Sequence, residues 1–306
     1  MAEICARVTA PVAVEVQGRR GVGTSTVTEA LGDAGLQIAA TGEVAVVVIA
    51  EVLKPEDRAL LTELSRAGRP AVVVFNKADL AGSSPGGPMA TAHRRARRLQ
   101  DMAGVPVVPM VALLASVALA AHEVAALGVL TREPGDLTSA DAFVDAPHRL
   151  PVEVRAGLLR RLDRFGIAHA TLALSRGADA ASLPGVLRGL SQVDRVLTAI
   201  DAAAAPVRYR RARWALTELR AIGGEAVGRF LAADDTVLAM MGAAVDVVQA
   251  EGLTVETGDG HVDHLCRARR WRHYRDGPVN ALHRRCADDI VRGSLRLLDA
   301  TAADRR

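Results

Sequence analysis

Short apolar runs rich in β-branched residues alternate with longer amphipathic stretches through the first half of the chain. An uninterrupted apolar run is typical of a strand buried on both faces, and amphipathic helices are the usual connections between parallel strands. The strands predicted on this basis are Val12–Val16, Val44–Ala50, Ala71–Phe75 and Val105–Val108. The helices predicted between them are Thr24–Asp33, Pro55–Ala67 and Ala90–Ala103. The pattern therefore predicts an α/β fold with a mostly parallel sheet.

The second half of the chain is predicted to be almost wholly helical. The α/β part first continues through a helix, a strand and a helix, predicted over Pro151–Phe165, Ile167–Leu174 and Ala180–Leu190. Beyond it, apolar residues recur at helical spacing. The helical segments predicted there are Val193–Ile222, Glu225–Phe230, Thr236–Glu251 and His261–Ala303. We therefore expect an α/β domain over residues 1–192, followed by a helical domain over residues 193–306.

Composition narrows the class of protein. A chain of 306 residues, of which 50% are hydrophobic, is long enough to form two domains with cores of their own. No uncharged apolar run reaches the ~18 residues of a membrane span, so no transmembrane segment is expected. The formal net charge of +3 is modest for this length and argues against a nucleic-acid partner. Three cysteines are too few for a disulfide framework, and we expect a cytoplasmic protein.

The tetrapeptide after the third predicted strand carries the most specific chemical signal in the sequence. Asn76, Lys77, Ala78 and Asp79 follow Ala71–Phe75 directly. A polar turn leaving a strand is the simpler alternative, because asparagine and aspartate both stabilise turns. A functional motif is favoured because the chain otherwise uses arginine for its surface charge, and only one lysine occurs outside this motif.

A glycine-rich loop follows the first predicted strand and has the spacing of a phosphate-binding loop. It reads Gly18, Arg19, Arg20, Gly21, Val22, Gly23, Thr24, Ser25, Thr26. Its glycines allow backbone N–H groups to form a concavity for an anion at the start of a helix. Thr24 stands where such loops carry a lysine. Loss of that charge-assisted contact weakens the binding of a terminal phosphate by about 1.5–3 kcal/mol, unless another cation replaces it.

Other residues of the loop are candidates for the missing functions. Arg19 or Arg20 could supply the cation, although a solvated surface pair is the simpler interpretation of these arginines. Ser25 occupies the position of a magnesium-binding hydroxyl, which makes Mg²⁺ a candidate cofactor, and Thr26 follows it. A serine at this position is equally a residue that begins a helix.

The two motifs together resemble the P-loop GTPase superfamily of the TRAFAC type, which includes dynamin-like and other bacterial large GTPases. The resemblance implies that Asp79 accepts hydrogen bonds from guanine N1 and N2. It implies that Lys77 lies along the base and that Asn76 ties this loop to the phosphate loop. In the segment Met110–Leu113, it places the N–H of Ala112 on guanine O6. The ligand that the resemblance implies is GTP or GDP.

A complete GTPase carries further elements between these two motifs: a switch threonine, two more strands and an Asp-x-x-Gly motif. The span between Ser25 and Asn76 is too short to hold them, and it contains no Asp-x-x-Gly. The resemblance therefore implies a degenerate, regulatory member with weak or absent hydrolysis. One alternative is a pseudo-GTPase that binds no nucleotide and acts as an interaction module. Another is a MinD/ParA-like ATPase, in which a signature lysine occupies the position of Arg19.

The helical half offers weaker signals. Arg208–Trp214 and Arg267–Arg275 interleave arginine with aromatic residues, as surfaces that bind lipid or RNA do. A solvated helix face with its aromatic residues packed inward is the favoured alternative, and peripheral membrane contact stays open. The histidines and cysteines between His261 and Cys286 match no familiar zinc-ligand spacing. We expect this half to bind a protein partner.

Overall fold

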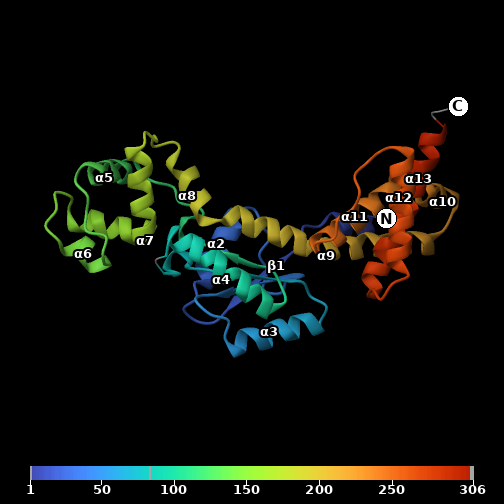
Figure 1. Cartoon of the computed structure of the whole chain (residues 1–306), viewed down its shortest axis with the longest axis horizontal. Coiled ribbons are helices and arrows are strands. Elements are labelled where there is room, and N and C mark those ends of the chain that lie inside the picture. The colour runs from blue at the N-terminus through green and yellow to red at the C-terminus, as the bar shows by residue number, and fades with distance from the viewer. Residues whose placement is uncertain (1, 83, 304–306) are drawn as a thin grey trace. The chain divides into compact units, whose positions relative to one another are not determined.

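The computed structural model describes residues 2–82 and 84–303, and they form two compact units (Figure 1). The first unit is Ala13–Ile200, and the second combines Met1–Val12 with Asp201–Arg306. Helix α9 (Val193–Ile222) begins in the first unit and continues in the second. The residues up to Val12, which the sequence pattern had grouped with the α/β domain, therefore belong to the helical unit.

A four-stranded, all-parallel sheet forms the centre of the first unit, which confirms the predicted α/β class. Its strands lie in chain order: β1 (Val14–Gly18), β2 (Val44–Ile49), β3 (Ala71–Phe75) and β4 (Val107–Pro109). All residues of β2 and β3 are buried, so both faces of the sheet are covered, as the continuous apolar runs indicated. On its other side, β1 meets only an isolated bridge to Ile38 among the described residues.

Three helices connect the strands close to the predicted positions. They are α2 (Thr24–Asp33), α3 (Pro55–Arg66) and α4 (Gly87–Ala103). Short 3₁₀ helices follow β3 and β4: η1 (Ala78–Leu80) and η2 (Ala112–Leu114). Four further helices then gather beside the sheet (Figure 1): α5 (Ala121–Arg132), α6 (Ala140–Asp145), α7 (Val152–Ser175) and α8 (Leu183–Ser191). Their apolar side chains join those of the sheet in one core.

The prediction of a strand over Ile167–Leu174 is wrong, because these residues belong to helix α7. Ile167 and Ala170 are fully buried and Leu174 is partly buried against the same core. Their spacing of three and four residues is that of one helix face. Within the segment, Ala168–Leu172 alternates apolar with polar residues, a pattern that strands also show.

The second unit is helical throughout its described residues. It contains α1 (Ala2–Thr9), most of α9, α10 (Glu225–Ala232), α11 (Asp234–Ala250), α12 (His261–Arg275) and α13 (Ala281–Ala303). Tyr209 and Trp271, from the two arginine-rich segments, are buried in its core. The Tyr209 hydroxyl donates to Asp289 Oδ2 at 2.6 Å, and Arg213 pairs with the same carboxylate. These aromatic side chains therefore pack inward, so they do not form an exposed stacking surface.

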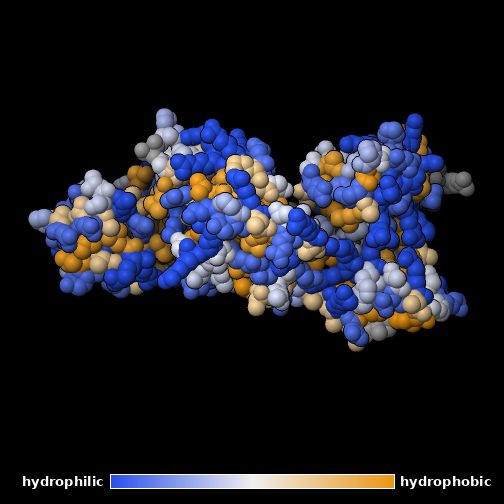
Figure 2. Space-filling view, turned by 90° about the horizontal axis from the view of Figure 1, so that it is seen from below, coloured by the Kyte–Doolittle hydropathy of each residue, from blue (hydrophilic) through white to orange (hydrophobic). Residues whose placement is uncertain are grey.

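None of the helices within residues 2–82 and 84–303 has both the length and the apolar character that a membrane span needs. On the face shown in Figure 2, hydrophobic side chains lie in patches between hydrophilic ones. The exposed hydrophobic residues include Leu80 beside the loop after β3, and Ile222 and Phe230 in the helical unit.

The central position of β2 leads to a test of the sheet. We expect Ile49→Ala to lower the free energy of unfolding by about 2–5 kcal/mol, because the Ile49 side chain is fully buried and its removal leaves a cavity. Val52→Ala is the control, since Val52 lies just beyond the strand and is 51% exposed; its effect should stay within about 0.5 kcal/mol. Urea unfolding followed by circular dichroism measures both. Equal effects would contradict the buried position of β2.

Candidate functional site

The loop between β1 and α2 has the backbone of an anion-binding loop. Gly21 and Gly23 have φ angles of +88° and +87°, which glycine adopts without strain. Gly23 precedes the first residue of α2, and no side chain caps this end of the helix. The first N–H groups of α2 are therefore available to an anion, and the helix dipole adds to the attraction.

Thr24 faces the inside of this loop. An added Cβ at Gly18 would lie 2.7 Å from Thr24 Oγ1, so the hydroxyl packs closely against the first glycine. Thr24 Oγ1 is buried and has no hydrogen-bond partner. An unpaired buried hydroxyl is unfavourable. Thr24 therefore brings no positive charge to the loop, and its short side chain lies against Gly18.

The two loop arginines have different surroundings. Arg19 Nε donates to both oxygens of Asp57, at 3.0 and 3.2 Å. Asp57 is 2% exposed and also accepts from the backbone N–H of Lys54 at 2.9 Å, which fixes it in the first turn of α3. Arg19 is therefore held by a buried carboxylate, and a phosphate would compete with that carboxylate for it. Arg20 is exposed.

Asn76 joins three loops. Its side chain is buried, Nδ2 donates to Val22 O at 3.0 Å, and Oδ1 accepts from the N–H of Ala112 at 3.1 Å. The first bond ties the loop after β3 to the phosphate loop, which is the contact that the GTPase resemblance implies. The second bond ties it to η2. Both polar groups of the side-chain amide thus have partners inside the protein.

Ala112 departs from the expected role. The resemblance implies that its N–H contacts guanine O6, but that N–H donates to Asn76. The difference arises because Ala112 is the first residue of η2 and its buried N–H faces the side-chain amide. Leu113 is the next residue, and it lines the cavity described below. Its N–H is the next backbone donor along η2.

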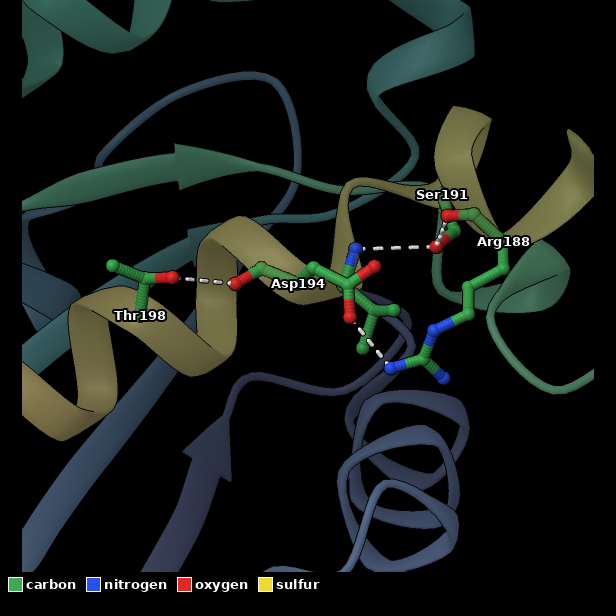
Figure 3. Close-up of polar contacts among 5 residues, drawn as sticks. Arg188, Ser191, Asp194 and Thr198 are labelled. Carbon is green, nitrogen blue, oxygen red and sulfur yellow. Dashed lines mark hydrogen bonds and ion pairs between the residues drawn. The ribbon is translucent and has the colours of Figure 1, made fainter. Parts of the chain in front are cut away.

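The corner between α8 and α9 holds η2 from the other side. The N–H of Val111 donates to Ser191 O at 3.0 Å, and Ser191 is fully buried. Ser191 Oγ donates to Arg188 O and accepts from the N–H of Val193, and Arg188 pairs with Asp194 at 2.6 Å (Figure 3). Because the ion pair is exposed, the buried bonds of Ser191 contribute most to this fastening.

A cavity of about 230 Å³ lies among these loops. Its lining residues are Gly23, Thr26, Asn76, Lys77, Asp79, Leu80, Val111, Ala112, Leu113 and Asp163. Lys77 has a φ of +56°, and its Nζ donates to Gly21 O at 3.0 Å, so its stem crosses from the loop after β3 to the phosphate loop. Several residues of both sequence motifs therefore meet at one cavity.

Asp79 is a partly buried acceptor on the wall of the cavity. Burial raises the pKa of its carboxyl above the ordinary value of 3.8, and the charge of Asp163 raises it further. Lys77 and Arg164 act in the opposite direction. The carboxylate form of Asp79 is therefore partly desolvated and would gain from ligand N–H donors.

Asp163 lines the cavity, although the sequence did not indicate it as a site residue. This residue lies inside α7, where a helical prediction places it among ordinary solvated charges. The structure breaks the helix there, with φ 52° and ψ 177° at Asp163, and puts the residue on the cavity wall. No local sequence signal marks it, and close to the break Gly166 of α7 lies against Leu114 of η2, a contact between segments distant in the chain.

Magnesium fits this site poorly. Ser25 is exposed at the first turn of α2. No cluster of three or more His, Cys, Asp or Glu side chains is placed to hold a metal ion within the described ranges. Magnesium in proteins is usually held by carboxylates together with substrate phosphates. An exposed serine hydroxyl by itself is therefore a poor site for Mg²⁺.

Comparison with known proteins identifies no family. The sequence matches no family model and no curated protein, and the structure matches no solved structure. The likeness to GTPases therefore depends on the two motifs and on the contacts that their residues make with one another.

Two glycines of the loop provide a matched pair for testing the Asn76 contact. Both have a positive φ, so alanine is strained at either position. A Cβ at Gly23 would lie 2.4 Å from Asn76 Nδ2, whereas a Cβ at Gly21 meets nothing within 4 Å. We expect Gly23→Ala to lower the free energy of unfolding by about 1–3 kcal/mol more than Gly21→Ala, because it also disrupts the buried bonds of Asn76. Urea unfolding gives the difference, and equal losses would contradict the contact.

Proposed function

We propose that the first unit is a guanine-nucleotide-binding module of degenerate GTPase type, with weak or no hydrolysis and a regulatory role. The observation that carries the proposal is the set of bonds made by Asn76, which joins the phosphate loop to the loop that presents Asp79. A polar turn with no ligand would not require a buried amide shared between three loops. In this proposal GDP or GTP is the ligand, and the helical unit contacts a protein partner in the cytoplasm.

Asp79 supplies the selectivity for guanine. The Watson–Crick edge of guanine offers N1–H and an exocyclic amino group, and a carboxylate accepts from both. Adenine presents an unprotonated N1 there, which a carboxylate repels. The cavity of about 230 Å³ is smaller than the ~300–1,000 Å³ of pockets that enclose a whole drug-sized ligand. It therefore suits the base, while the phosphates lie over the glycine-rich loop.

The proposed site is expected to bind the phosphates less strongly than the base. Backbone N–H groups at the start of α2 can bind a diphosphate, but Thr24 provides no charge and Arg19 is held by Asp57. GTP therefore gains little over GDP from its terminal phosphate. Phosphoryl transfer depends on magnesium, charge neutralisation and an oriented water. The described residues of this site offer no evident provider of these, which supports slow hydrolysis or none.

The nucleotide-free pseudo-GTPase is the second candidate. The buried, unpaired hydroxyl of Thr24 and the engaged guanidinium of Arg19 favour it, because both weaken the attraction for phosphate. The MinD/ParA-like ATPase ranks lower, because it would need Arg19 free to reach a phosphate, and Arg19 is paired with Asp57. Titration with both guanine and adenine nucleotides separates these candidates.

Nucleotide titration tests the proposed base site. We expect fluorescent GDP and GTP analogues to bind saturably and an ATP analogue to bind far more weakly. Asp79→Asn should shift the preference from guanine to xanthine nucleotides, because its amide donates to the xanthine oxygen that replaces the amino group. Asp101→Asn, which changes an exposed carboxylate on α4, is the control. An absence of saturable binding at high micromolar nucleotide would overturn the proposal.

Phosphate release tests the hydrolysis expectation separately. We expect purified wild-type protein and Asp79→Ala to release phosphate from GTP at the same rate, close to that of buffer alone. The reason is that the phosphate loop carries no lysine and its neighbour Arg19 is held by Asp57. Turnover well above that background, and lost in Asp79→Ala, would contradict a weak or inactive site.

A further inference from the structure

Two carboxylates share the wall of the cavity. Asp79 follows β3, whereas Asp163 comes from the break in α7, far along the chain. No lysine, arginine or histidine within residues 2–82 and 84–303 forms an ion pair with either of them. Two negative groups on one cavity wall repel each other, and Asp163 contributes to the raised pKa of Asp79. Such a wall favours a ligand that presents several N–H donors.

The position of Asp163 is held by packing. Leu162 and Ile167, on either side of the break, are fully buried. Gly166 lies so close to η2 that an added Cβ would be 2.8 Å from Leu114 Cδ2. The backbone conformation at Asp163 is one that non-glycine residues rarely adopt, and such strain costs about 1–3 kcal/mol. The close contact with η2 fixes Asp163 relative to the loop that closes the base cavity.

The charge of Asp163 is also left available. Its Oδ1 accepts from the N–H of Arg164 at 2.5 Å, which leaves the other oxygen for a ligand. The guanidinium of Arg164 points elsewhere and donates to Leu137 O and Thr138 O. Arg164 therefore lowers the pKa of Asp79 through space without closing an ion pair with Asp163.

Building on the guanine-nucleotide site proposed above, we propose that Asp163 is a second base-reading carboxylate, which accepts a hydrogen bond from the exocyclic 2-amino group of guanine. Guanine offers three N–H hydrogens along this edge. Asp79 takes the N1–H and one amino hydrogen, and the second amino hydrogen points toward a further acceptor. Asp163 provides that acceptor, and the shared donor group offsets the repulsion between the two carboxylates.

This arrangement predicts a strong selection for the amino group itself. Hypoxanthine is the matched probe, because it keeps N1–H and O6 and lacks only the 2-amino group. If Asp79 alone read the base, a base without the amino group would still donate its N1–H to Asp79. With two carboxylates, loss of the amino group leaves the second oxygen of Asp163 facing the ligand without a donor, in a partly buried wall. Rejection of hypoxanthine should therefore depend on Asp163.

The experiment measures the affinities of GDP and inosine diphosphate for wild-type protein, Asp163→Asn, Asp163→Gly and the control Asp101→Asn. Asparagine has the shape of aspartate and so adds no strain beyond that already present at this position, and glycine adopts this backbone conformation readily, so either variant can keep the break in α7. We expect the ratio of GDP to inosine diphosphate affinity to fall about tenfold in both Asp163 variants, mainly through weaker GDP binding. Asp101→Asn should leave the ratio unchanged. A role of Asp163 in folding alone would weaken both ligands equally.

The pH dependence provides a second readout. GDP affinity should fall on acidification as Asp79 takes up a proton, at a pH above the 3.8 of an ordinary aspartate. Lys77 and Arg164 also face Asp79, and both lower its pKa. Asp163→Asn removes a negative charge, so the pKa of Asp79 should drop and the fall in affinity should move to lower pH.

The outcomes separate the two proposals. If wild-type protein binds GDP and both Asp163 variants keep the wild-type ratio, Asp163 does not read the base, and the guanine-nucleotide site stands. A pH midpoint that does not move in Asp163→Asn also overturns the role of Asp163. If wild-type protein binds no GDP, both the nucleotide site and the role of Asp163 are overturned.

Discussion

The buried amide of Asn76 is the interaction on which the arrangement of the site depends. It donates a hydrogen bond to a carbonyl of the phosphate loop and accepts one from an N–H of η2, and the side chain is buried away from water. A buried backbone group without a partner is destabilising by about 1–3 kcal/mol, and the Asn76 side chain provides the partner for one such group in each loop. The amide also explains why position 23 is a glycine, because a Cβ at Gly23 would displace the Asn76 side chain.

The two ends of the proposed ligand site differ in how completely they are built. The base end has a cavity, a partly buried acceptor at Asp79 and a lysine stem laid across to the phosphate loop. The phosphate end has the glycine backbone and the open helix start, while Thr24 is turned inward and Arg19 is held by Asp57. In the proposed role, the nucleotide is held mainly by its base and its terminal phosphate adds little, as in a fixed module and not in a switch.

The helices that follow η2 contribute to this site as well as to the core. Helix α7 packs against η2 through Gly166, and its break brings Asp163 to the cavity. The corner of α8 and α9 fastens the same loop through Ser191. The cavity is thus closed by segments that lie well beyond the motifs in the sequence, and the two motif loops alone do not form it.

The sequence by itself determined the sheet and the two motif loops. Continuous β-branched runs can be buried only between two layers, which is why β2 and β3 were predictable, and glycines at Gly21 and Gly23 are required by their backbone. Tertiary packing decided the helical state of Ile167–Leu174, the bond that occupies the N–H of Ala112, and the place of Asp163. The physical reason is that local patterns specify which face of a segment is apolar. Which polar groups then meet depends on contacts between segments distant in the chain.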